Sequence, residues 1–212
     1  MRVLIVDDHP IARRGLQMIV SEAFGATDCA EAPDAATALA VAARLCPDLL
    51  LLDMHMPGDI PAPVLCGRLR SMLPAAKVVI VTAFERSDEI RDCLVAGADG
   101  CLLKDTSEAD MAASLRAVVT GSTALDSRIA FSLARDLAAA EPGPGPTGAP
   151  NLSSREQDVL CLLAEGCSNR VIARRLGLSE ATVKGHVSKL LEKLTASSRL
   201  DAVVRAYGAG LI

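Results

Sequence analysis

Short, unbroken apolar runs recur through the first half of this 212-residue chain, and they constrain its fold more than any other feature. They lie at residues 3–6, 49–52, 78–81 and 101–103. Each run is continuous rather than alternating, which is typical of a strand buried on both faces of a sheet. A parallel sheet with helices on both sides is therefore expected.

Helical patterns separate these runs. They lie at about residues 11–24, 34–46, 61–73, 86–96 and 107–120, and residues 27–30 are a weaker candidate for a second strand. Regular alternation of strand and helix is typical of parallel βαβ units. The sequence therefore predicts an α/β domain over residues 1–121, with a doubly wound, five-stranded parallel sheet.

A stretch rich in proline and glycine ends this region. Residues 138–150 hold four Pro and three Gly, which can neither continue a helix nor join a sheet. A helix is expected just before it, at about 127–138, because Ile129 and Leu133 recur at helical spacing. Residues 122–150 are interpreted as a connecting helix and an extended linker.

The remaining residues, 151–212, show only helical patterns. Ser153 and Glu156 fit a capping box at the start of the first helix. Two of the helices are joined by a short turn with a glycine, which indicates a helix-turn-helix at 168–194. The sequence predicts a small all-α tetrahelical domain, with helices at about 153–164, 168–175, 179–194 and 198–207.

Composition narrows the class of protein. Only three Phe and one Tyr occur, with no Trp, so aromatic stacking on nucleic-acid bases is not expected. Seven cysteines without a CxxC pair, and three scattered histidines, indicate reduced thiols rather than a zinc site. No apolar run approaches the roughly 20 residues of a membrane span. We expect a cytoplasmic protein with no membrane partner.

Charge divides the chain. Residues 1–150 carry a net −7 and residues 151–212 a net +3. An acidic first region and a mildly basic second region indicate different partners. A net charge of +3 is too small to establish nucleic-acid binding by itself.

Polar side chains follow the ends of the predicted strands. Asp7 and Asp8 end the first, Asp53 the third, Thr82 the fourth and Lys104 the fifth. Carboxyl ends of parallel strands share one edge, so these groups are expected to converge there. Oxygen ligands favour Mg²⁺, and an ammonium suits a phosphoryl oxygen. A single such Asp is often only a helix cap, so the prediction depends on the whole set.

The motifs VLIVDD, LLLLDMHMP, VIVTA and CLLKD resemble the receiver domain of two-component response regulators, over about residues 1–121. The resemblance implies a flavodoxin-like fold and a phosphoryl group taken by Asp53 from a sensor histidine kinase. It implies that Asp8, Asp53 and the main-chain carbonyl of His55 ligate Mg²⁺ directly. Asp7 acts on the metal mostly through water.

The same resemblance implies that Thr82 and Lys104 bind phosphoryl oxygens. It also reveals a departure: Cys101 stands where the family usually has an aromatic or His side chain, at the switch position. In the family, the ring is thought to turn inward when the Thr hydroxyl engages phosphate. Cysteine is too small to turn in this way, so the usual response of this position to phosphorylation is in question. Cys101 can be read as a small buried strand residue or as a redox sensor.

The helix at 181–194 has one apolar face and a polar face with three lysines. That pattern suits a helix in a DNA major groove, and it equally suits an ordinary surface helix. The wider segment LSSREQDVLCLLAEGCSNRVIARRLGLSEATVKGHVSKLLEKL resembles the LuxR-type DNA-binding domain, over about 151–207. The resemblance places base contacts at Lys184, Gly185 and Ser188, and backbone contacts at Thr182, Lys189 and Asn169.

The whole chain thus resembles a response regulator of the NarL/FixJ type, which is a transcription factor and not an enzyme. The resemblance implies a homodimer on promoter DNA, joined through the last helix, with RNA polymerase as a further candidate partner. It also implies that the unphosphorylated DNA-binding region can dock on the receiver and hide the recognition helix.

Two alternatives compete with this interpretation. The first is a LuxR-type transcription factor that works without phosphorylation because its receiver is uncoupled, which Cys101 motivates. The second is a haloacid-dehalogenase-like phosphohydrolase, which needs a second Asp two residues after the nucleophile, where this chain has His55.

Overall fold

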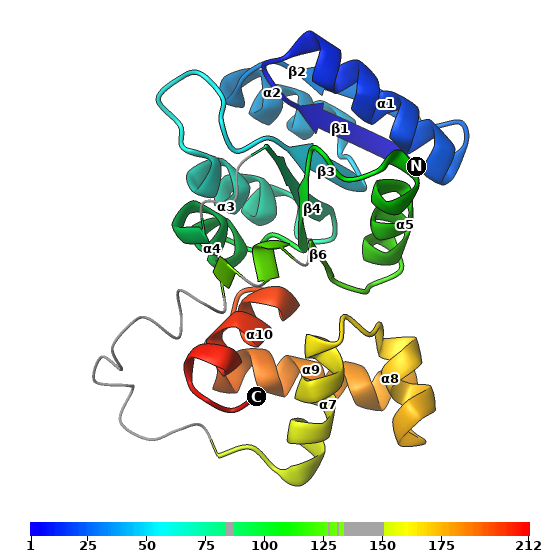
Figure 1. The fold of residues 1–212 in the computed structure, drawn as a ribbon, viewed down its shortest axis with the longest axis vertical. Helices are drawn as coiled ribbons and strands as arrows, with labels where there is room; N and C mark the ends of the chain where they lie inside the picture. The colour runs from blue at the N-terminus through cyan, green and yellow to red at the C-terminus, as the bar shows by residue number, and fades with distance from the viewer. Residues whose placement is uncertain (84–86, 127, 131, 134–150) are drawn as a thin grey trace.

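The computed structural model describes residues 1–83, 87–126, 128–130, 132–133 and 151–212. Their first part is a parallel six-stranded sheet between two layers of helices, and their last part is a helical domain (Figure 1). The strands are β1 (Arg2–Val6), β2 (Asp28–Ala32), β3 (Leu49–Leu52), β4 (Lys77–Thr82), β5 (Gly100–Leu103) and β6 (Ala124–Leu125), in the spatial order β2-β1-β3-β4-β5-β6.

Five helices cover the sheet: α1 (Pro10–Phe24), α2 (Ala35–Leu45), α3 (Ala62–Met72), α4 (Ser87–Val95) and α5 (Glu108–Val119). The continuous apolar strands feed a core on each face. In β1, Leu4 and Val6 join the core beneath α2, α3 and α4, whereas Val3 and Ile5 join the core beneath α1 and α5. Alternation with period two places successive side chains on opposite faces, so a strand between two cores is apolar throughout.

The sixth strand corrects the prediction of five. β6 pairs in parallel with β5, with Ala124 opposite Gly100 and Leu125 opposite Cys101. The sheet therefore extends to Leu125, beyond the boundary expected at residue 121. Two residues are too few to show a periodic pattern, and this strand forms because β5 offers it an edge.

The helix expected at 127–138 is seen in part. Residues 128–130 and 132–133, here called the connecting segment, are helical. The rest of that helix, and the linker expected at 138–150, lie outside the described residues.

The last part of the chain folds as the four predicted helices, α7 (Ser154–Ala164), α8 (Asn169–Leu176), α9 (Glu180–Lys193) and α10 (Arg199–Gly208), around a core of their own. Each begins after a serine whose side chain accepts a hydrogen bond from a backbone N–H, and the capping box of Ser153 and Glu156 is present. None of the helices in the described ranges has both the length and the apolar character of a bilayer span.

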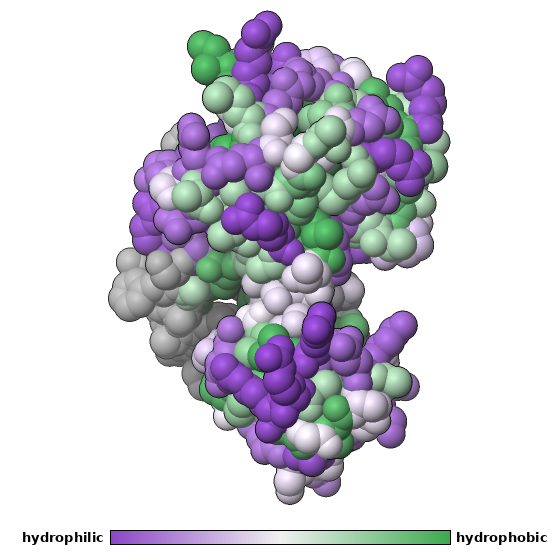
Figure 2. Space-filling view, turned by 90° about the vertical axis from the view of Figure 1, so that its right-hand side faces the viewer, coloured by the Kyte–Doolittle hydropathy of each residue, from purple (hydrophilic) through white to green (hydrophobic). Residues whose placement is uncertain are grey.

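The two parts meet at α10, which lies below α4 in Figure 1. Its Leu200 and Val204 belong to the core that covers the α2–α3–α4 face of the sheet. Ser198 Oγ donates to the carbonyl of Ala98 at 3.2 Å, and the Arg199 guanidinium donates to the carbonyls of Gly121 and Cys167. On the face drawn in Figure 2 the molecule forms two lobes that meet at a narrower waist.

Candidate phosphoacceptor site and nucleic-acid interface

The strand ends bring the predicted site residues to one edge of the sheet. Asp7 and Asp8 follow β1, Asp53 follows β3, Thr82 ends β4 and Lys104 follows β5. Backbone hydrogen bonds extend the strand pairing into this edge, from Asp53 N to the Val6 carbonyl at 2.8 Å and from Lys104 N to the Thr82 carbonyl at 2.7 Å. The side chains of Asp7, Asp53 and Thr82 are buried.

Lys104 joins two of these carboxylates. Its Nζ lies 2.8 Å from Asp53 Oδ2 and 2.6 Å from Asp7 Oδ2. Partial burial lowers the pKa of this ammonium, but its hydrogen bonds to Asp53 and Asp7 outweigh that effect and the net pKa is raised. The ammonium therefore stays charged at neutral pH, beside the carboxylate expected to take the phosphoryl group.

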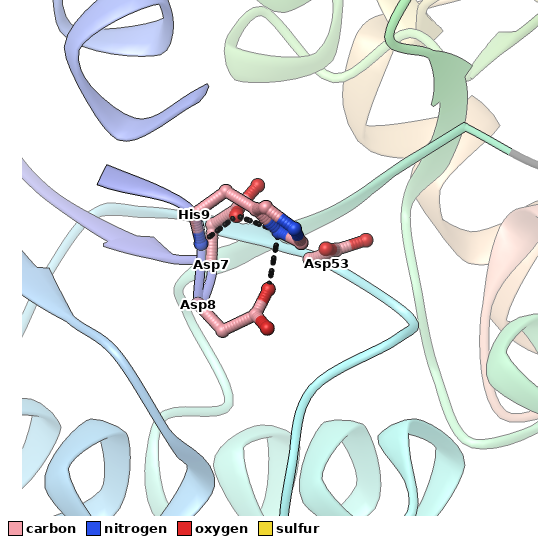
Figure 3. A group of neighbouring side chains, drawn as sticks. All are labelled: Asp7, Asp8, His9 and Asp53. Atoms are coloured by element: carbon pink, nitrogen blue, oxygen red, sulfur yellow. Dashed lines mark hydrogen bonds and ion pairs between the residues drawn. The ribbon is translucent and has the colours of Figure 1, made fainter. Parts of the chain in front are cut away.

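Three carboxylates and one ammonium leave this edge with an excess of negative charge. Ligand atoms of Asp7, Asp8, His9 and Asp53 all lie within 4.8 Å of one another (Figure 3). Asp7 Oδ2 and Asp8 Oδ1 are buried, and their ion-pair partners among the described residues are Lys104 Nζ for the first and His9 Nδ1 for the second. One ammonium does not balance three carboxylates, and buried negative charge is costly unless a further cation neutralises it, so the set fits a hard divalent ion.

His9 also belongs to this group. Its Nδ1 lies 2.5 Å from Asp8 Oδ1 and its backbone N–H donates to Asp7 Oδ1 at 2.8 Å (Figure 3). The imidazole is 70% exposed, so it lies at the mouth of the site.

His55 lies close to Asp53 at the same edge of the sheet. His55 follows β3, its backbone N–H points to Asp53 Oδ1 at 3.4 Å, and its Nε2 lies 3.5 Å from Glu89 Oε2.

Cys101 is fully buried in β5, and burial raises the pKa of its thiol to about 12. A buried thiol with a raised pKa is a poor nucleophile, which favours the structural over the redox interpretation of Cys101.

Most of the residues expected to contact DNA are exposed to solvent. On α9, Thr182, Lys184, Gly185, Ser188 and Lys189 are all exposed, whereas the apolar face of this helix is buried. Asn169, at the start of α8, differs. It is half-buried and lines a cavity of about 660 Å³ together with Thr120 and Gly121 of the sheet domain.

Comparison with known proteins agrees with both the acidic site of the first domain and the helical second domain. The family model of the response regulator receiver domain matches residues 3–116, and that of bacterial regulatory proteins of the luxR family matches residues 150–206. The chain is a response regulator of the NarL/FixJ type. The family consists of DNA-binding transcription regulators, not of enzymes.

Curated relatives match over nearly the whole response regulator. The nitrate/nitrite response regulator NarL of Escherichia coli K12 is 35% identical, over 95% of this chain and 93% of NarL. NarP of the same strain is 38% identical, over 96% and 93%. The DNA-binding transcriptional activator DevR/DosR of Mycobacterium tuberculosis H37Rv is 34% identical, over 97% and 94%.

Solved structures share the fold. RcsB of Salmonella typhimurium has a TM-score of 0.59 at 23% identity, with 96% of each chain covered. ChrA, the response regulator of a heme-sensing two-component system, has a TM-score of 0.53 at 32% identity, with 100% of this chain and 98% of ChrA covered.

The way the two domains of this response regulator dock differs from the expectation. Helix α10 packs on the receiver, whereas the face of α9 that was expected to meet DNA is exposed. The reason is the apolar pair Leu200 and Val204, which α10 directs into the receiver core.

Sequence reasoning missed several neighbours of the site. Arg13 of α1 donates to the Asp7 carbonyl at 2.7 Å and pairs with Glu31 at 2.5 Å. Arg128 pairs with Asp105, the residue after Lys104. Neither arginine stands in a periodic pattern, and only the fold brings each to its partner.

Proposed function

We propose that Asp53 accepts a phosphoryl group from the phosphohistidine of a sensor histidine kinase, and that the modified chain binds promoter DNA as a homodimer to regulate transcription. The observation that carries the proposal is the position of Lys104 Nζ, 2.8 Å from Asp53 Oδ2. A strand-end carboxylate with a fixed counter-charge is suited to phosphoryl transfer.

In the transfer, an oxygen of Asp53 attacks phosphorus and forms an acyl phosphate as the N–P bond of the donor breaks. Negative charge on the transferred phosphoryl group is neutralised by the Lys104 ammonium, which is already oriented by Asp53 and Asp7. The Thr82 hydroxyl, at the end of the adjacent strand, donates to a second phosphoryl oxygen.

The residues of the acidic edge fit Mg²⁺. Asp8, Asp53 and the main-chain carbonyl of His55 would hold it directly, and Asp7 mostly through water. When bound, Mg²⁺ neutralises carboxylate charge and polarises a phosphoryl oxygen. The excess of carboxylates over the single ammonium of Lys104 at this edge supports this assignment.

For DNA, we propose that α9 enters the major groove. Lys184, Gly185 and Ser188 would contact bases, and Thr182 and Lys189 would contact backbone phosphates. Their exposure and the matching luxR family model support the placement, and the relative DevR/DosR is a DNA-binding transcriptional activator. Because it would bind promoter DNA, we expect the protein to be cytoplasmic. RNA polymerase is a further proposed partner.

Light-scattering mass tests the proposal. The full chain is measured with Mg²⁺, with and without beryllofluoride, a mimic of the phosphoryl group. We expect a shift from monomer to dimer in the wild type and none in Asp53→Asn. No change in the wild type, with beryllofluoride shown to be bound, would contradict phosphorylation-controlled assembly.

One observation favours a second candidate, a LuxR-type transcription factor with an uncoupled receiver. Cys101 is buried in the core and supplies no ring that could turn with the state of Thr82. The two candidates differ in one measurement. Equal affinity for promoter DNA in the wild type with beryllofluoride and in Asp53→Asn would favour the uncoupled receiver.

A further inference from the structure

Arg128 of the connecting segment holds two carboxylates close to the phosphoacceptor site. Its Nη1 and Nη2 donate to the two oxygens of Asp105 at 2.7 and 2.6 Å, and its Nε donates to Asp126 Oδ1 at 3.2 Å. The hydrogen bonds from Arg128 hold the pKa of the Asp105 carboxyl below its usual range. A bidentate guanidinium–carboxylate pair fixes direction as well as distance.

The first end of this cluster is attached to the proposed reaction site. Asp105 follows Lys104 directly in the chain, and the ammonium of Lys104 contacts Asp53. Thr106 Oγ1 donates to Asp126 Oδ2 at 3.2 Å, and Asp126 N donates to the carbonyl of Cys101 at 3.0 Å. Asp126, which follows β6, therefore contacts both β5 and the loop that carries Lys104.

The other end packs on the face of the sheet that α10 also covers. Ile129 follows Arg128 and is fully buried, and Leu133 is 4% exposed. Both belong to the same buried cluster as Leu200 and Val204 of α10. The connecting segment and α10 therefore share one buried cluster, while Arg128 links that segment to the loop after β5.

Stability alone does not account for this arrangement. Arg128 is 44% and Asp105 68% exposed, and exposed ion pairs contribute little to the free energy of unfolding. The pair instead fixes the position of the connecting segment relative to the loop that holds Lys104. Cys101 has no aromatic ring that could respond to phosphorylation. If the two domains are coupled, another contact must connect Asp53 to the DNA-binding domain.

We infer that the cluster of Asp105, Asp126 and Arg128 transmits the state of Asp53 to α10; this inference rests on the function proposed above. When Lys104 follows a phosphoryl group on Asp53, the loop shifts and Asp105 moves with it. Arg128 then carries the connecting segment away from its packed position, and α10 loses part of its support on the receiver. The segment is the two-state element that both sites bias.

The experiment measures the distance between the domains together with occupancy of the site. Cys46 and Cys161 are exposed, one in each domain, and accept spin labels once Cys29 and Cys167 are replaced by serine. Distributions of the distance between the two spin labels are recorded by pulsed electron paramagnetic resonance with Mg²⁺, with and without beryllofluoride. An excess of unlabelled chain removes the contribution of label pairs in different protomers. Fluorine NMR reports bound beryllofluoride in the same samples.

In the wild type, we expect beryllofluoride to raise the ratio of undocked to docked chains by about 5-fold or more. Arg128→Ala should bind beryllofluoride as well as the wild type does, yet its ratio should no longer respond. Asp105→Asn, which keeps the side-chain shape, should lose the response too, and the double variant should be no worse than either single variant. Arg2→Ala is the matched control, because it removes an ion pair of similar exposure, with Asp48, at the other end of the strands.

Two results would overturn the inference. If Arg128→Ala keeps the full response while beryllofluoride is bound, the relay is wrong although the proposed function stands. If the wild type binds no beryllofluoride, the proposed function fails and the relay fails with it.

Discussion

The ammonium of Lys104 lies 2.8 Å from Asp53 Oδ2, and it reaches Asp53 from the end of a different strand. Because β4 lies between β3 and β5 in the sheet, this contact spans a strand that contributes Thr82 at the same edge. The carboxylate expected to take the phosphoryl group thus has its counter-charge in place.

Replacing Lys104 by alanine should slow phosphorylation of Asp53 from acetyl phosphate by about 100-fold or more, since the variant loses the group that neutralises the transferred charge. Intact mass against time gives the rate. Lys184→Ala removes the same charge from α9 and should keep the wild-type rate. Comparable rates in Lys104→Ala and the wild type would show that the ammonium has no role in the transfer.

Gly185 should be the most sensitive position on the recognition helix to an added acid. Apart from its chain neighbours and the backbone of its own helix turn, no atom of the described residues lies within 4 Å of a Cβ built there, so Gly185→Glu is expected to fold normally. Its carboxylate would face DNA, and specific promoter affinity should be lost in a gel-shift assay. Gly15→Glu adds the same charge at an open position of α1 and should bind DNA as the wild type does. Retained promoter affinity in Gly185→Glu would disprove the placement of α9.

Two glycines should respond in opposite directions to alanine. At Gly100 a Cβ would lie 2.7 Å from the carbonyl oxygen of Ala124, so Gly100→Ala should force β6 from β5 and destabilise the receiver by about 1–3 kcal/mol. Gly185→Ala has open space and should stabilise its domain by about 0.5–1 kcal/mol. Calorimetry of the full chain measures both. An unchanged receiver transition in Gly100→Ala would mean that β6 contributes nothing to the stability of the sheet.

Acid should weaken the DNA-binding domain through Glu156. Hydrogen bonds from Lys193 and Ser153 lower the pKa of this carboxyl from 4.5 to about 2. Because the folded-state pKa is the lower one, the stabilisation is complete above about pH 5 and is lost as the pH falls through 4.5 toward 2. Melting temperature as a function of pH tests this, and Glu156→Gln should show a smaller loss over that range. Parallel curves for the two proteins would rule out Glu156 as the source.

Local patterns in the sequence were sufficient for most of the fold. Continuous apolar runs predicted β1, β3, β4 and β5, and serines predicted the starts of the helices after residue 150. These signals are local because burial on two faces and capping each leave a mark within a few residues. The strand-end rule also predicted which polar residues would meet, and the structure brings Asp7, Asp53 and Lys104 into contact.

Tertiary structure alone decided what depends on partners far apart in the chain. β6 exists because β5 offers an edge, and Arg128 finds Asp105 across 23 residues without any periodic pattern. The choice of α10 over α9 as the docking helix followed from where Leu200 and Val204 meet the receiver core. Short pairings, single ion pairs and contacts between domains leave no repeat in the sequence, because their energy arises only when distant segments have already been brought together.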